Sequence, residues 1–134
     1  MTMVDSEKLK NELRHFTGSE TWHKWSVLYP KFLLTDGAKF LADEAQCYWL
    51  MDIIGSYQKR LLPNEAFQVW KLTVYTEPIE SAHHNIAASV ICEDGNNHTL
   101  IQQYIEFTDF PLNEIKLYFI WDGDCGTILL PSEY

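Results

Sequence analysis

The apolar and polar positions of this chain follow two different periods, one on each side of residue 60. Residues 36–59 carry apolar side chains around almost the whole circumference of a helix, apart from one narrow polar stripe of Lys39, Asp43 and Gln46. From residue 66 onward the apolar residues recur at every second position, as they do in β-strands. Because a helix this apolar must be covered on nearly all sides, we expect it to lie across a sheet.

The second half of the chain predicts five strands with turn-rich connections, at residues 66–76, 83–92, 99–108, 114–121 and 127–130. Connections this short cannot join parallel neighbours, since a parallel crossover needs a dozen or more residues. A shorter helix is expected at 7–15, and two short extended pieces at 25–29 and 31–34. The prediction is an α+β fold in one domain, residues 1–134. It is an antiparallel meander of four to five strands, with one long and one short helix packed on one face.

The turn at Asp94 and Gly95 predicts the register of the first hairpin. A two-residue type I′ turn would pair Glu93 with Asn96 and place Ala88 opposite Ile101. The face under the long helix would then carry Ile86, Ala88, Val90, Ile101, Ile105, Phe107, Ile115, Leu117, Phe119 and Trp121.

The opposite face of the predicted sheet is half apolar, with Leu100, Ile120 and Leu129 among polar residues. Sheets that face solvent usually show a cleaner polar alternation. We therefore expect this outer face to be partly covered, either by the first helix or by a second copy of the protein.

Composition and charge exclude some classes of partner. The chain has 134 residues, is 46% apolar and has a net charge of −9, from 19 acidic against 10 basic residues. Nucleic acids and anionic membranes attract basic surfaces, so we expect neither as a direct partner. The charge could favour a basic protein partner, or it could simply keep the protein soluble.

Cysteine usage and the N-terminus predict a cytoplasmic protein. Three cysteines without C-x-x-C spacing fit reduced thiols better than a disulfide framework. We find no export pattern and no apolar run long enough for a membrane span. Residues 122–133 resemble a calcium loop but have Gly at position five instead of position six. Neither a metal nor a cofactor is predicted.

One polar cluster on the predicted outer face could carry chemistry. In the meander His83 would lie across from Glu106, Glu106 across from Lys116, and Tyr104 across from Tyr118. A carboxylate between two bases can orient an imidazole for acid–base work. The alternative is ordinary cross-strand charge pairing, which contributes about 0.2–1 kcal/mol for each pair.

Asp52 is a second candidate, because its position on the helix falls on the apolar side. Partial burial would raise the pKa of its carboxyl group and create a general acid or base. Alternatively a Tyr, Trp or Arg partner satisfies the carboxylate and fixes the helix in place. A third group, Trp22, His23, Trp25 and Tyr29, could stack on a sugar or grip a peptide, or else close one edge of the core.

Several segments together resemble a family of small uncharacterised bacterial proteins, a domain of unknown function that is frequent in cyanobacteria and on mobile elements. They are LTDGAKFLADEAQCYWLMDIIGSYQ, FQVWKL, IEFTDFPLNEIKLYF and the terminal LLPSEY. The resemblance would cover residues 10–134 and is clearest at Asp36-Gly37, Trp49, Asp52, Trp70 and residues 131–134. It implies a bacterial single-domain protein and assigns no activity or site residues.

These observations favour a non-enzymatic protein-interaction module that binds another protein or forms a homodimer. A role as an accessory of mobile DNA is one form that this hypothesis takes. The alternative is a small enzyme or small-ligand-binding domain. It would use His83, Tyr104, Glu106 and Lys116, or Asp52, on the sheet or between helix and sheet.

Overall fold

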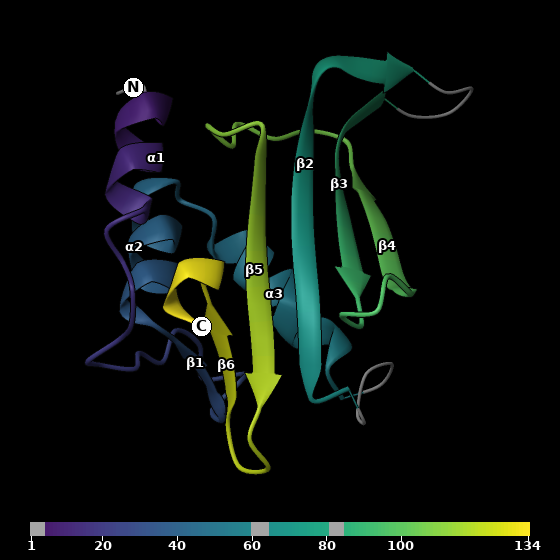
Figure 1. Cartoon of the computed structure of the whole chain (residues 1–134). Helices are drawn as coiled ribbons and strands as arrows, with labels where there is room; N and C mark the ends of the chain where they lie inside the picture. Colours follow the sequence, from purple (N-terminus) through teal and green to yellow (C-terminus); the bar gives the residue numbers. More distant parts are fainter. Residues whose placement is uncertain (1–4, 60–64, 81–84) are drawn as a thin grey trace.

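The computed structural model describes residues 5–59, 65–80 and 85–134 and has an α+β fold (Figure 1). Its helices are α1 (Ser6–Leu13), α2 (Asp36–Glu44) and α3 (Tyr48–Tyr57), followed near the C-terminus by the 3₁₀ turn η1 (Pro131–Glu133). The strands are β1 (Phe32–Leu34), β2 (Phe67–Glu80), β3 (Asn85–Glu93), β4 (Thr99–Ile105), β5 (Glu114–Trp121) and β6 (Gly126–Leu129).

All six strands form one mixed sheet in the order β1-β6-β5-β2-β3-β4. The predicted four- to five-stranded antiparallel meander is therefore wrong in two respects. The strand β1 pairs in parallel with β6, and β5 pairs with β2 instead of following β4 at the edge. In Figure 1 the connection from β4 to β5 passes behind β2.

The β4–β5 connection explains this topology. We predicted a tight turn at residues 109–113, but Phe110 and Leu112 are both buried in the core. Their burial anchors the connection across the end of the sheet. As a result the next strand, β5, pairs with β2. Its Leu117 and Phe119 are also buried.

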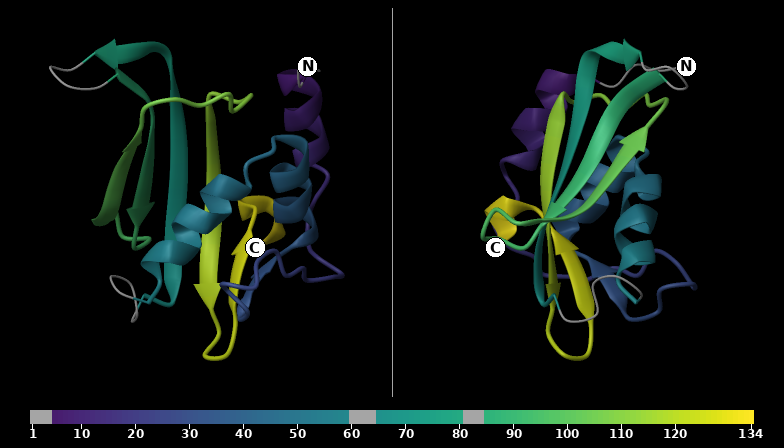
Figure 2. Two further views of the ribbon diagram at one scale, coloured as in Figure 1. Left: turned by 180° about the vertical axis from the view of Figure 1, so that it is seen from behind. Right: turned by 90° about the vertical axis from the view of Figure 1, so that its right-hand side faces the viewer.

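The predicted long helix is two helices. Gln46 adopts the left-handed backbone conformation, with φ of 51°, and Cys47 N–H donates to the Ala42 carbonyl at 3.0 Å. This break lets α2 pack beside α1, β1 and β6, while α3 crosses the back of the sheet (Figure 2). The expectation that the segment is covered is confirmed, since Leu41, Met51 and Ile54 are fully buried.

The first hairpin has a longer loop than predicted. Cys92 pairs with Ile101 and Glu93 with Thr99, so residues 94–98 form the loop. The Asp94 carboxylate accepts hydrogen bonds from the backbone N–H groups of Asn96 and His98, which holds the wider loop. The register differs from the prediction by four residues. Because four is even, the faces are unchanged, and Ala88 and Ile101 are buried as predicted. Phe107, predicted on the covered face, is 86% exposed.

The C-terminal segment covers part of the outer face of the sheet, opposite α3. Figure 1 shows η1 in front of the sheet. The rings of Phe67, Tyr118 and Tyr134 contact one another there, with centroids 5.1–5.7 Å apart. Leu129 is buried. The first helix does not cover this region, because Phe16, just beyond α1, packs on Phe40 of α2.

The same C-terminal segment fixes the start of α2. Thr35 is the N-cap, and the Glu133 carboxylate accepts hydrogen bonds from Thr35 Oγ1 at 2.6 Å and Gly37 N–H at 3.0 Å. A Cβ atom at residue 37 would meet the side chains of Glu133 and Leu130, which would have to shift, so glycine leaves room for the Glu133 carboxylate at this position. Residues 36–37 and 131–134, two of the places where the family resemblance is clearest, therefore meet for a structural reason.

Candidate functional site

The predicted outer-face cluster is not assembled by this topology. Tyr104 lies on β4, Glu106 directly follows β4, and Lys116 lies on β5, with β2 and β3 between those two strands. Lys116 is directly opposite Lys71 of β2, so the predicted neighbours Glu106 and Lys116, and Tyr104 and Tyr118, are wrong. His83 lies outside the described residues. A binding role for any one of these residues remains a prediction.

Asp52 is exposed on α3, so its predicted partial burial is wrong. Its carboxylate accepts a hydrogen bond of 3.1 Å from the indole N–H of Trp25. This is the alternative that we considered from the sequence, a Trp partner that fixes the helix. The contact ties the segment before β1 to α3.

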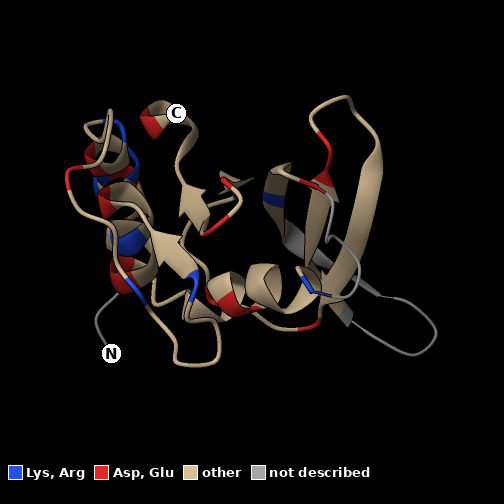
Figure 3. Ribbon diagram, turned by 90° about the horizontal axis from the view of Figure 1, so that it is seen from below, with Lys and Arg blue, Asp and Glu red and all other residues tan. Residues whose placement is uncertain are grey.

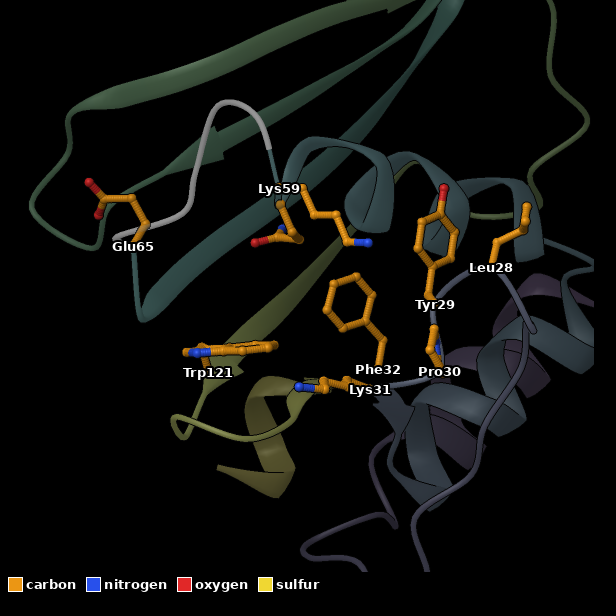
Figure 4. A pocket seen from close by; sticks show the side chains of 9 residues that line it. Leu28, Tyr29, Pro30, Lys31, Phe32, Lys59, Glu65 and Trp121 are labelled. Atoms are coloured by element: carbon orange, nitrogen blue, oxygen red, sulfur yellow. The ribbon is translucent and has the colours of Figure 1, made fainter.

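The structure instead has a pocket between the end of α3 and the sheet (Figure 4). We call it the helix–sheet pocket. Its volume is about 400 Å³. Four stretches of chain meet there: the segment entering β1, the end of α3, the start of β2 and the end of β5. The lining residues are Leu28, Tyr29, Pro30, Lys31, Phe32, Gln58, Lys59, Glu65 and Trp121.

Aromatic rings form the walls of this pocket. Tyr29 stacks on Phe32 with ring centroids 5.6 Å apart, and Phe32 meets Trp121 edge-on at 6.0 Å. Gly55 of α3 allows Tyr29 to approach, since a Cβ atom there would lie 3.2 Å from the ring. Tyr29, which the sequence pattern predicts either in the core or in contact with a bound peptide, lines the pocket.

A buried amide pair lies behind the pocket. Gln58 and Gln68 exchange two hydrogen bonds, at 2.8 and 2.7 Å, and Gln68 is 0% exposed. The Gln58 amide also donates to the Ile54 carbonyl, so both of its N–H groups are used. The indole of Trp70 donates to Gln68 Oε1 as well. This network fixes α3 on β2 and leaves Gln58 with no donor for a ligand.

Sequence reasoning missed this pair, although one signal was present. Gln68 occupies the same alternating positions as Trp70 and Leu72, which predicts that it faces the core. Gln58 gives no such signal, because it begins a polar run at the end of the helix.

The charged side chains of the pocket are Lys31, Lys59 and Glu65. Figure 4 shows both lysine side chains beside the rings, whereas the Glu65 carboxylate points away from them. Figure 3 looks at this end of the molecule from below and shows acidic residues spread over the surrounding elements. Two cations beside apolar walls can hold a ligand that is apolar and carries one negative charge.

The cysteines and His23 are not among the residues that line the pocket. Burial raises the pKa of the Cys47 and Cys92 thiols to about 12, so neither is an effective nucleophile at neutral pH. His23 donates to Asp36 at 2.8 Å, and this bond, aided by the Glu20 backbone N–H, lowers the pKa of Asp36. The pair stabilises the entry to α2. Among the described residues, no group of three His, Cys, Asp or Glu side chains could hold a metal ion.

These features define an α+β protein with a mixed sheet, helices across one face and an aromatic pocket at one end. The chain belongs to the family of unknown function DUF6876, whose model matches residues 7–134. This confirms the resemblance to an uncharacterised family; its cyanobacterial and mobile-element associations stay a prediction. None of the curated proteins matches the chain.

A solved structure shares the fold. It is described as the crystal structure of a protein of unknown function from Enterococcus faecalis. It superposes with a TM-score of 0.53 at 13% identity, covering 83% of this chain and 98% of the other. Within the described ranges, no helix has the length and apolar character needed to cross a membrane.

Proposed function

We propose that this protein is a binding module that captures an apolar side chain of a partner protein in the helix–sheet pocket. A carboxylate next to that side chain would be held by Lys31 and Lys59. The observation that supports the proposal best is the composition of the pocket. Rings form its walls, and lysines supply two of its three charges.

The exposed rim of the pocket favours a protein over a small molecule. Leu28 lines the pocket and is 74% exposed, and its neighbour Val27, outside the pocket, is 94% exposed. A small ligand inside the pocket would leave this rim in water. A protein surface would cover it. Contiguous exposed apolar residues often mark the sites where proteins bind one another.

The charge of the pocket differs from that of the whole chain. The chain carries −9, but charges farther than about 8 Å are largely screened at physiological salt. Two of the three charged residues that line the pocket are lysines, and the carboxylate of the third, Glu65, points away from the rings (Figure 4). A single acidic residue beside the apolar anchor fits this lining. More distant parts of the partner would be neutral or basic, to suit the acidic surface.

The magnitude of binding by one anchor can be estimated. Burying one large apolar side chain contributes about 1.5–3 kcal/mol, and a rim charge contact adds about 0.2–1 kcal/mol. A dipeptide should therefore bind with a dissociation constant between about 1 mM and several tens of millimolar. A whole partner would add the contacts at Val27 and Leu28.

The test is calorimetric titration of the protein with three blocked dipeptides: acetyl-Phe-Glu-amide, acetyl-Phe-Lys-amide and acetyl-Ala-Glu-amide. We expect the Phe-Glu peptide to bind about threefold more tightly than Phe-Lys. The Ala-Glu peptide, which lacks the anchor, should show no measurable binding. A longer peptide with apolar flanks should bind more tightly than the dipeptide. If the longer peptide bound no more tightly than the Phe-Glu dipeptide, the pocket would be a small-ligand site.

Two pairs of variants locate the site. Leu28→Glu should abolish binding of the Phe-Glu peptide, whereas Val27→Glu, the same change one residue outside the pocket, should not. Lys59→Glu should remove the preference for Phe-Glu, and Lys116→Glu, on the exposed outer face of β5, is its matched control. Equal losses within either pair, or no binding by the wild-type protein, would refute the proposal.

A cytoplasmic location is also part of this proposal. The three cysteines are all free thiols, two of them buried, which supports a reducing compartment.

A further inference from the structure

The edge of the sheet formed by β4 has unusual properties for a monomeric protein. β4 is the last strand of the sheet, with β3 on one side and no described strand on the other. In the left view of Figure 2 it lies at the rim of the molecule. Alternate residues of such an edge direct backbone N–H and C=O groups away from the sheet, where another strand can pair with them.

The opposite edge of the sheet is closed. Its strand β1 has three residues, and His23 pairs with Leu34 on its outer side through backbone hydrogen bonds of 2.8 and 2.7 Å. Within residues 5–59, 65–80 and 85–134, the sheet therefore offers one long free edge. Pairing through one edge can produce a closed dimer but no continuing fibre.

The β4 edge lacks the features by which monomers usually prevent pairing. Its sequence, TLIQQYI, contains no charged residue and no proline. The register shift beside Cys92 is at the start of the strand and leaves residues 101–105 regularly paired with β3. Two large aromatic side chains stand exposed here, Tyr104 at 54% and Phe107 at 86%.

We propose that two copies of this protein pair antiparallel along β4, forming a continuous twelve-stranded sheet from two six-stranded ones. A second copy fits this edge better than another kind of partner does. An uncharged strip attracts neither a basic nor an acidic protein, but it allows two chains of charge −9 to approach. A two-fold axis across β4 also brings like residues together, so the strip is complementary to itself.

The distribution of charge makes a specific prediction about salt. Two chains of −9 repel each other, while the contact strip itself is neutral. Raising the salt concentration from about 0.05 to 0.5 M should therefore screen the repulsion and tighten the dimer. An interface held by salt bridges would weaken instead.

The test is sedimentation velocity of the full chain over a range of concentrations, together with hydrogen exchange. We expect a monomer–dimer equilibrium, and slower exchange of the amides of residues 101–105 in the dimer than in the monomer. Gln102→Lys places like charges near the two-fold axis and should weaken dimerisation at least about tenfold. Ser56→Lys, the same charge change on exposed α3, should not.

Several results would overturn the inference. They are a monomer at every concentration, a dimer whose β4 amides exchange at the monomer rate, or equal dimerisation of the two lysine variants. Circular dichroism of both variants checks that they fold. If Gln102→Lys does not fold, Tyr104→Lys, at another exposed position of the strand, replaces it with the same expected loss. The dipeptide titrations concern a different end of the molecule, so either proposal can fail alone.

Discussion

The polar chemistry of the helix–sheet pocket depends on three residues, Lys31, Gln58 and Lys59. Both N–H groups of the Gln58 amide donate hydrogen bonds within the protein, to Ile54 and Gln68. Gln58 therefore stabilises the pocket without donating to a ligand. The lysines keep their ammonium groups beside the rings. Recognition in our proposal therefore depends on apolar burial and on charge, with no neutral hydrogen-bond donor from Gln58.

The cysteines allow a prediction at this scale. Burial raises the pKa of Cys47 and Cys92 to about 12, whereas Cys125 is partly exposed in the turn before β6. Alkylation with iodoacetamide at pH 8, followed by mass spectrometry, should add one label to each folded chain, at Cys125. In denaturant all three cysteines should react. Rapid labelling of Cys47 in the folded protein would contradict its burial.

The elements show which features a local pattern can predict. The bounds of β5, residues 114–121, agree with the sequence prediction, because period-two alternation is a property of the strand itself. The neighbours of β5 could not be predicted in this way. They depend on Phe110 and Leu112, which read as turn residues beside Pro111 but are buried in the core. The candidate cluster of Tyr104, Glu106 and Lys116 required β5 to pair with β4. In the structure β2 and β3 separate those two strands, so the cluster does not form.

The broken helix is a second case of tertiary structure overriding a local pattern. The helical pattern continues through residues 45–47, with Gln46 on the polar stripe, and nothing in it distinguishes one long helix from two. The two helices cover different parts of the twisted sheet: α2 contacts β1 and β6, and α3 lies behind β5 and β2 (Figure 1), where Tyr57 packs on Trp70. The left-handed Gln46 provides the change of direction.

This break predicts the effect of glycine at residue 46. A left-handed backbone is unfavourable for a residue with a side chain and costs glycine nothing. Gln46→Gly should therefore leave the free energy of unfolding unchanged or raise it by up to about 1 kcal/mol. The control Ser56→Gly, inside α3, should lower it by about 0.5 kcal/mol. Urea denaturation measures both. A loss of about 1 kcal/mol at residue 46 would indicate one continuous helix.

At the scale of the whole molecule, the topology gives the sheet two different ends. At one end β1, β5 and the end of α3 enclose the helix–sheet pocket. At the other, β4 has no further neighbouring strand within the described residues. The sequence predicted an α+β protein with a covered helical segment and a half-apolar outer face. It did not predict the pocket, because Tyr29, Lys59 and Trp121 are far apart in the chain and meet only through the order of the strands.

We propose that this protein binds its partner at the helix–sheet pocket. The most direct measurement is a two-dimensional ¹H–¹⁵N NMR titration of the labelled protein with acetyl-Phe-Glu-amide, up to about 10 mM. We predict progressive shifts of the Trp121 indole and of the backbone amides of Phe32 and Lys59, with the β4 amides unchanged. Shifts confined to other parts of the molecule, or a spectrum that does not change, would contradict it.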